Sequence, residues 1–264
     1  SYLYAHPWQK KELVGAKYTS YVPVWLEQDQ LHIAKQQIES SLQHELVHVL
    51  AKQFGNRLFN ASWSIGLVEG IAVALAPDES LTSTIDQIVA SEQPYPPAEE
   101  MRGALQPFGF YGGRPAVNYT TSGSFVKHLL QEYPARNFKE AYRTGSIEEA
   151  YGVSLSELVE SWHRQLDTVT VDSTDRQIAR RMFGRPSLFE QKCPHILTGF
   201  ARTWDQYQLN ITEEDTTQAL RSLDEALQHA PGSGRVRAEW ILMHLKAGNE
   251  EQVQQKTPPE DASP

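Results

Sequence analysis

The segment SLQHELVHVL contains three residues that could together carry out hydrolytic chemistry. His44 and His48 lie four positions apart, and Glu45 directly follows the first histidine. On a helix, side chains four positions apart project from the same face, so both imidazoles can reach one metal ion. Neutral imidazole is a good zinc ligand, and the glutamate can accept a proton from a water molecule held by the metal. The competing interpretation is an ordinary amphipathic helix that happens to contain two histidines.

A catalytic zinc site needs three protein ligands and one open position, so the two histidines are not sufficient. Glu69, in the segment GLVEGIAVAL, is the candidate for the third ligand. Its apolar neighbours predict burial, and a buried carboxylate needs a cation; the alternative is an ordinary surface carboxylate. Gly70 beside it would let two helices approach closely. We therefore predict a zinc site formed by His44, His48 and Glu69, with Glu45 as the general base.

The elements that position these residues follow from the pattern of apolar side chains. SYLYA, YTSYVPVWL and QLHIA are rich in β-branched and aromatic residues, which predicts strands in residues 1–34. From about Ala34 the apolar residues recur at three- and four-residue steps, which predicts a helix that ends near Gly55. The next helix is predicted to begin near Ser64, with Ser62 or Ser64 as its N-cap.

The rest of the first half predicts mostly helices. LTSTIDQIVA predicts a third helix. Residues 91–119 are rich in proline, glycine and aromatics and have little periodicity, which predicts a long loop. Helical patterns return at TSGSFVKHLLQEY, NFKEAYRTG, SIEEAYG and SLSELVESWHRQLD. TVTVDSTD is the predicted domain boundary. The predicted fold class is α+β for residues 1–168, followed by an all-α region for residues 169–264.

The pattern of the C-terminal region predicts two helices and the start of a third. TTQALRSLDEALQHAPGSGRVRAEWILMHLKAGNEEQVQQ predicts a helix, a Pro-Gly turn, a second helix and the start of a third. The pattern is similar to one degenerate unit of the tetratricopeptide type, and one unit is too few for an array. Such helices could bind a protein partner. The tail TPPEDASP is predicted to be disordered.

The overall composition limits the classes of function. The net charge of −9 argues against a nucleic-acid binder, which usually carries a basic face. No apolar run approaches the length of a membrane span. Cys193 is the single cysteine, so an internal disulfide is excluded, and we expect a buried, unreactive thiol. The chain opens SYLYAHPWQ, and we expect a piece of a longer protein, for example the extracytoplasmic portion of a bacterial secreted or membrane-anchored protein.

The motifs together resemble a known group of enzymes. HELVH followed by LVEGIA resembles the gluzincin metallopeptidases, whose third zinc ligand is a glutamate on the helix after the HExxH helix. The closer resemblance is to the peptidase MA-like proteins of bacteria. These typically continue with a tyrosine-containing segment that leads into a G-S-F helix and with a G-V-S-L-x-E-L-x-x-x-W stretch, here NYTTSGSFVKHLL and GVSLSELVESW. The resemblance covers about residues 1–167 and implies a zincin-like domain with a small mixed sheet and active-site helices.

The resemblance also implies roles for individual residues. It implies the metal ligands and general base named above, and it matches Tyr119 to a tyrosine that in some gluzincins hydrogen-bonds the oxyanion. The alternative for Tyr119 is a core aromatic near a helix start. The thermolysin-like branch has an acidic residue where this chain has Val73, so the partner that orients the histidines must come from elsewhere. By analogy, Leu31–Ala34 could be an edge strand along which a substrate pairs.

Two functions from different classes follow. The leading hypothesis is a zinc-dependent metallopeptidase that hydrolyses a peptide or protein substrate, with Glu45 activating the water. The alternative is a catalytically weak or inactive metal-bound scaffold that binds another protein through the C-terminal helices. Glu45 separates them, because a pure scaffold has no chemical need for a general base.

Overall fold

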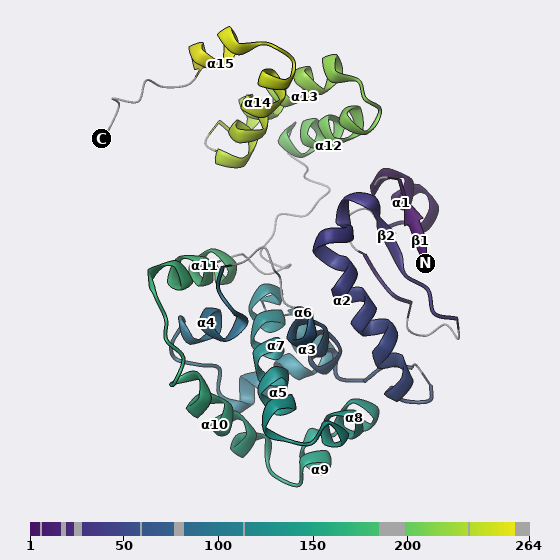
Figure 1. Cartoon of the computed structure of the whole chain (residues 1–264), viewed down its shortest axis with the longest axis vertical. Coiled ribbons are helices and arrows are strands. Elements are labelled where there is room, and N and C mark those ends of the chain that lie inside the picture. Colours follow the sequence, from purple (N-terminus) through teal and green to yellow (C-terminus); the bar gives the residue numbers. More distant parts are fainter. Residues whose placement is uncertain are drawn as a thin grey trace. The chain divides into compact units, whose positions relative to one another are not determined.

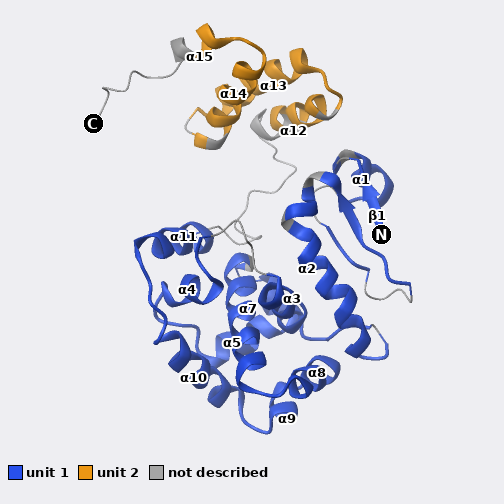
Figure 2. Cartoon of the chain, in the orientation of Figure 1, with its two compact units in different colours: residues 1–191 blue, residues 192–264 orange. Residues whose placement is uncertain are grey.

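The computed structural model describes residues 1–5, 7–16, 20–23, 28–58, 60–76, 82–112, 114–184, 199–231 and 233–256 (Figure 1). Within these ranges the chain forms two compact units, residues 1–191 and residues 192–264 (Figure 2). Among the described helices, none is both long and apolar enough to cross a membrane.

The described chain is mostly helical, so the predicted α+β, zincin-like fold class is wrong. Its named strands are β1, Tyr2–Tyr4, and β2, His32–Ala34, which pair in parallel with Tyr2 opposite His32. Strands do form within SYLYA and QLHIA, as predicted, but Pro7–Val14 between them forms helix α1. Between α1 and β2, Tyr21 makes only an isolated antiparallel bridge to His32 within the described residues. Two strands of three residues do not make a sheet that could organise a domain.

The helices of the first unit surround one main core. They are α2 (Ile38–Ala51), α3 (Ile65–Leu75), α4 (Ile85–Ala90), α5 (Ala98–Leu105), α6 (Pro107–Gly112), α7 (Pro115–Glu132), α8 (Ala135–Thr144), α9 (Ile147–Tyr151), α10 (Leu155–Leu166) and α11 (Ser173–Phe183), with 3-10 turns η1 (Lys35–Gln37) and η2 (Lys52–Phe54) flanking α2. Fully buried side chains from α3, α7 and α10 form its centre, including Leu67, Phe125, Leu129 and Trp162.

Helix prediction succeeded where the apolar period was clear and failed between residues 91 and 119. The predicted helix ending near Gly55 is α2 followed by η2, and Gly55 is the C-cap of that turn. The predicted long loop is wrong, because α5, α6 and the first turn of α7 lie there. Pro97, Pro107 and Pro115 stand at or before helix starts, where a missing N–H costs nothing. These prolines begin helices instead of preventing them.

The first unit extends beyond the predicted boundary at residue 168. Val169 and Val171 pack against the main core. Asp175, in the first turn of α11, accepts hydrogen bonds from the Ser83 hydroxyl and, at 3.4 Å, from the Gln87 side-chain amide. The segment TVTVDSTD therefore belongs to the first unit, because its two valines and Asp175 find partners there.

The second unit has a small core of its own. Its helices are α12 (Gly199–Thr212), α13 (Thr216–His229), α14 (Gly234–Lys246) and α15 (Glu250–Lys256), in the order that the sequence predicts for the last three. Tyr207 and Trp240 are the largest buried side chains, and the Trp240 indole donates to Asp224 at 2.7 Å. Cys193 and the tail TPPEDASP lie outside the described residues.

Close packing of α3 against α7 depends on two glycines. A Cβ at Gly70 would lie 2.8 Å from the Ser122 carbonyl oxygen, and a Cβ at Gly123 would lie 2.4 Å from a Val73 methyl group. The close approach expected at Gly70 is therefore present, and the neighbouring helix is α7.

We expect Gly70→Ala to lower the free energy of unfolding by about 1–3 kcal/mol, because the added methyl group has backbone on one side and no room to move. Gly103→Ala, within α5, is the control, since a Cβ there meets nothing within 4 Å. Alanine in a helix interior should raise stability by roughly 0.5–1 kcal/mol. Urea unfolding with a chelator present checks both variants, and equal stability of the two would contradict this account.

Candidate metal centre

Helix α2 places His44 and His48 on one face. It starts directly after β2 and η1, with Glu39 in its first turn, where a negative charge favours the helix dipole. The two imidazole rings meet edge to face, with centroids 4.8 Å apart. His48 is buried, and the His44 side chain keeps a quarter of its surface exposed. The i, i+4 spacing thus produces the convergence that the sequence predicts.

Packing on two sides fixes the rotation of α2. Val47 and Ala51 pack against the main core, whereas Ile38, Leu42 and Val49 pack against a smaller cluster that contains Ile33 of β2. The side chains of His44 and His48 project from the face of α2 that lies between these two packed faces.

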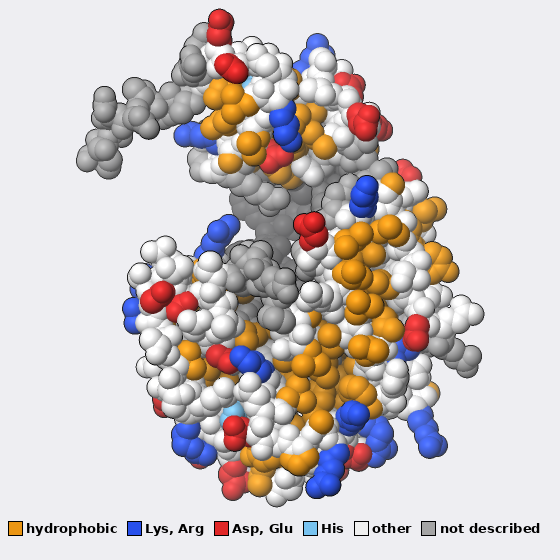
Figure 3. Space-filling model, in the orientation of Figure 1, with side chains coloured by type: hydrophobic (Ala, Val, Ile, Leu, Met, Phe, Trp, Pro, Cys, Tyr) orange, Lys and Arg blue, Asp and Glu red, His pale blue; other side chains and the backbone are white. Residues whose placement is uncertain are grey.

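The remaining face of α2 is exposed. Leu46 and Leu50 are 44% and 61% exposed. Figure 3 shows hydrophobic side chains gathered over α2 on the face in view. Both leucines belong to the apolar repeat that predicts this helix, and both lie on the solvent side because α2 is held on its two flanks.

Helix α3 brings Glu69 to the histidines. Its N-cap is Ser64, whose hydroxyl accepts from the Leu67 N–H at 3.4 Å and donates to the Leu105 carbonyl at 2.7 Å. This start agrees with the sequence prediction. Most neighbours of Glu69 on the helix are buried, and its own side chain is 14% exposed.

The three side chains converge on one point. His44 Nε2 lies 3.2 Å from Glu69 Oε2, His48 Nε2 lies 3.5 Å from the same oxygen, and the two Nε2 atoms are 3.1 Å apart. In a tetrahedral site with metal–ligand bonds of about 2.0–2.2 Å, neighbouring ligand atoms lie about 3.3–3.6 Å apart. The observed spacings are close to the edges of such a tetrahedron, so the group could hold a metal ion.

Electrostatics at this cluster favour a cation. Burial raises the pKa of Glu69, but hydrogen bonds from His44 and His48 outweigh it and hold the pKa at about 2. The carboxylate is therefore charged at neutral pH. His48 Nδ1 is buried and has no hydrogen-bond partner among the described residues. One polar atom of this cluster therefore makes no hydrogen bond within the described residues.

Glu45 lies beside the cluster in a shielded position. The residue is 7% exposed, and burial raises the pKa of its carboxyl group, although the neighbouring histidines and Lys10 act in the opposite direction. Lys10, on α1, is fully buried, and its ammonium donates to Gln37 Oε1 at 2.7 Å. Helix α1 thus places a positive charge near Glu45, which the sequence analysis did not identify.

Tyr119 lies in α7, where Phe110 packs edge to face against its ring at 4.9 Å. Burial raises its pKa, and the charges of Glu69 and Glu45 raise it further. The phenol is therefore neutral and within electrostatic range of both carboxylates. The residue is in the helix itself, not at the end of a loop as predicted, and its catalytic role stays a prediction.

Two further phenols lie within electrostatic range of Glu69, and sequence analysis identified neither. Burial raises the pKa of Tyr142, and the Glu69 charge adds to the increase. Burial likewise raises the pKa of Tyr111, and the Glu69 charge adds to the increase. Tyr111 stands in GFYGG, which was predicted to be loop, so nothing in its spacing pointed to the site.

The predicted edge strand Leu31–Ala34 is not an open edge at its centre. The His32 N–H donates to the Tyr21 carbonyl at 3.0 Å, and the Tyr21 N–H donates to the His32 carbonyl at 3.2 Å. On the other side, β1 pairs with β2 in parallel. Both sides of β2 are occupied at His32, which leaves no free ladder there for a substrate.

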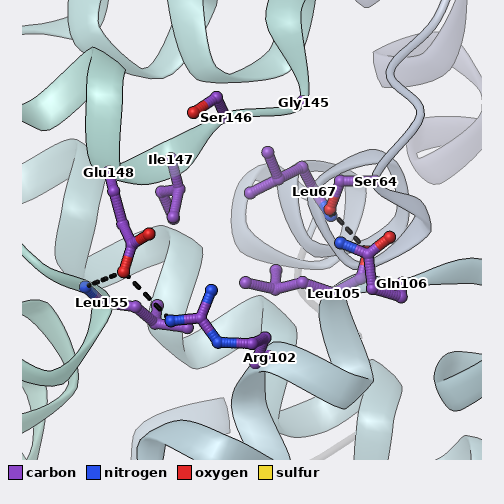
Figure 4. A pocket seen from close by; sticks show the side chains of 10 residues that line it. All are labelled: Ser64, Leu67, Arg102, Leu105, Gln106, Gly145, Ser146, Ile147, Glu148 and Leu155. Atoms are coloured by element: carbon purple, nitrogen blue, oxygen red, sulfur yellow. Dashed lines mark hydrogen bonds and ion pairs between the residues drawn. The ribbon is translucent and has the colours of Figure 1, made fainter.

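A separate cavity of about 170 Å³ does not include the predicted site residues (Figure 4). Leu67, Leu105 and Ile147 form part of its apolar wall. Arg102 and Glu148 face each other at its rim, with Nη2 and Oε1 3.0 Å apart. Both side chains are largely exposed, so this ion pair adds little stability.

Comparison with protein-family models, with curated proteins and with solved structures found no match to this chain. The functional argument therefore depends on the residues of the site.

Proposed function

We propose that this protein is a zinc-dependent peptidase in which His44, His48 and Glu69 bind the metal and Glu45 is the general base. The observation that carries the proposal is the convergence of three ligand atoms at 3.1–3.5 Å, with a buried glutamate next to the first ligand in sequence. The resemblance to gluzincin motifs also supports the proposal. The proposal depends on the metal-ligating residues and not on the fold class.

The donor set fits zinc. Two imidazole nitrogens and one carboxylate oxygen leave a fourth tetrahedral position open, as catalytic zinc sites require. Magnesium and calcium prefer sites made of oxygen atoms alone. When bound, zinc would supply Lewis acidity, which polarises a carbonyl group and lowers the pKa of water.

The chain's own residues would then move the protons. Glu45 accepts a proton from water as the water oxygen bonds to the carbonyl carbon of the peptide. The C–N bond breaks, and the same glutamic acid delivers the proton to the departing nitrogen. The burial of Glu45 suits this cycle, because a carboxyl group with a raised pKa both accepts and returns a proton readily.

Tyr119 would stabilise the negative charge that develops on the carbonyl oxygen. We expect Tyr119→Phe to lower kcat by about a hundredfold to a thousandfold, the loss of one preorganised donor. KM should change little, because the interaction strengthens in the transition state. Steady-state kinetics measure both constants, and full activity in this variant would remove Tyr119 from the catalytic residues.

A direct test of the proposed function compares metal-free and zinc-loaded protein on a peptide library, with cleavage read by mass spectrometry. We expect new termini only with the zinc-loaded protein. One equivalent of bound zinc per chain together with no cleavage of any peptide or protein substrate would favour the metal-bound scaffold. Absence of zinc binding would overturn both functions.

A further inference from the structure

The cavity in Figure 4 reaches from the surface to the main core of the first unit. Its apolar lining comes from buried core residues on four helices, α3, α5, α9 and α10: Leu67, Leu105, Ile147 and Leu155. In Figure 4, Leu67 and Leu105 point from one side, and Ile147 from the other, toward the space between them. The interior of the cavity is therefore apolar.

The size of the cavity limits what it can hold. An engineered cavity of about 150 Å³ lined by apolar side chains binds benzene, whereas pockets for drug-sized ligands measure about 300–1,000 Å³. The cavity here has a volume of about 170 Å³. It can therefore take one aliphatic group of about four to six carbon atoms.

The rim of the cavity carries two opposite charges that keep unused hydrogen-bonding capacity. Glu148 Oε1 accepts from Arg102 Nη2 at 3.0 Å and from the Leu155 backbone N–H at 3.0 Å. The second bond fixes the carboxylate, whose other oxygen, Oε2, has no hydrogen-bond partner among the described residues. A guanidinium group has further N–H donors beyond the one that Glu148 occupies. Both side chains are about half exposed, so a ligand can reach them from solvent.

We propose that this cavity binds a free α-amino acid with a branched aliphatic side chain, of which L-leucine is the probe. The aliphatic side chain fills the apolar interior. The carboxylate of the ligand accepts hydrogen bonds from Arg102, and its ammonium group donates to Glu148 Oε2. This binding site lies apart from the metal cluster and does not depend on the proposed peptidase activity.

The arrangement of charges favours a zwitterion over a simple acid or amine. An anion bound to Arg102 would lie next to the Glu148 carboxylate, and a cation bound to Glu148 would lie next to the guanidinium, so each would meet a like charge. A free amino acid carries both charges on one carbon atom. They match the opposite charges of Arg102 and Glu148, whose Nη2 and Oε1 atoms are 3.0 Å apart. A peptide separates its two terminal charges, so only one of them could reach this rim.

Titration of the full chain with L-leucine, followed by methyl NMR, tests the proposal. We expect the Ile147 methyl signals to shift with a Kd on the order of 1 mM or below, as for a small ligand that binds with moderate efficiency. Ile88, buried in α4, does not line the cavity, and its signals should stay in place. Zinc-loaded and chelator-treated protein should respond alike, so the result is separate from the fate of the peptidase proposal.

Ligands and variants that each lack one charge test the recognition by the rim. Isocaproate lacks the ammonium group, isoamylamine lacks the carboxylate, and each should bind about tenfold or more weakly than L-leucine. Arg102→Gln and Glu148→Gln should weaken L-leucine binding to a similar extent, while the exposure of both side chains lets the fold persist. Glu148→Gln should bind isocaproate more tightly than the unmodified protein does, and Arg102→Gln should do the same for isoamylamine.

Arg143→Gln is the matched control, because Arg143 pairs with Glu140 in an exposed ion pair that does not line the cavity. It should leave L-leucine binding unchanged. Failure of L-leucine to shift the Ile147 signals at concentrations up to about 10 mM would overturn the proposal. Equal binding of the three ligands, or unchanged L-leucine binding in both rim variants, would also overturn it, since the charges of the rim would then recognise nothing.

Discussion

Replacing His48 by alanine should lower zinc affinity by more than about a hundredfold. Mutating a residue that only hydrogen-bonds a metal ligand already lowers metal affinity by about 10–100-fold, and losing a direct ligand should cost more. The variant should also lose peptidase activity. His48 is buried and supplies one of three converging ligand atoms, so its loss leaves two protein ligands for the metal. Elemental analysis and competition with a chromogenic chelator measure the stoichiometry and the affinity.

Thermal unfolding gives an independent check on this expectation. Zinc at a hundred times its dissociation constant should stabilise the unmodified protein by about 2.7 kcal/mol, and it should not stabilise His48→Ala at the same concentration. His128→Ala is the control, since His128 is also buried but pairs with Gln165. It should lose stability yet keep its response to zinc. An unchanged zinc stoichiometry and affinity in His48→Ala would show that the assigned ligand set is wrong.

Replacing Glu45 by glutamine should leave zinc binding intact and lower turnover by at least about a hundredfold, the low end of general acid–base catalysis. Glutamine keeps the size and polarity of the side chain but cannot accept the proton from water. Because Glu45 is not one of the three converging ligands, the metal content should stay at one per chain. Turnover on a peptide identified by mass spectrometry and zinc analysis on the same sample give the two quantities.

Glu39→Gln is the matched control for this change. It makes the same substitution on α2, at an exposed position in the first turn, and it should leave turnover unchanged. The comparison also separates the two functional hypotheses. A metal-bound scaffold has no step that uses Glu45, so its partner binding should survive Glu45→Gln. Unchanged turnover in Glu45→Gln would show that another group activates the water.

The local sequence determined the site's components. Spacing on a single helix brings His44 and His48 to one face, and the apolar stretch around Glu69 predicts its burial. The N-cap at Ser64 follows from side-chain chemistry within one turn, and Gly55 stands at the predicted helix end, where a Cβ would meet the backbone of Asn60 and Ala61. These features depend on residues close together along the chain, which is why the sequence alone could predict them.

Only the tertiary structure decided the fold class and the surroundings of the site. Prolines and aromatics in residues 91–119 suggested a loop, but packing of Phe110 and Met101 into the core stabilises α5 and α6 there. The exposure of Leu46 and Leu50 depends on which flanks of α2 are covered.

The groups that act on Glu45 and Glu69 from other segments were likewise beyond local pattern. Lys10 is distant in sequence from Glu45, Tyr111 is distant from Glu69, and no periodicity relates the members of either pair. Local spacing fixes which side chains share one helix face. The contacts between helices, made by close approach at Gly70 and Gly123, fix which faces meet, because burial free energy depends on the whole packed arrangement.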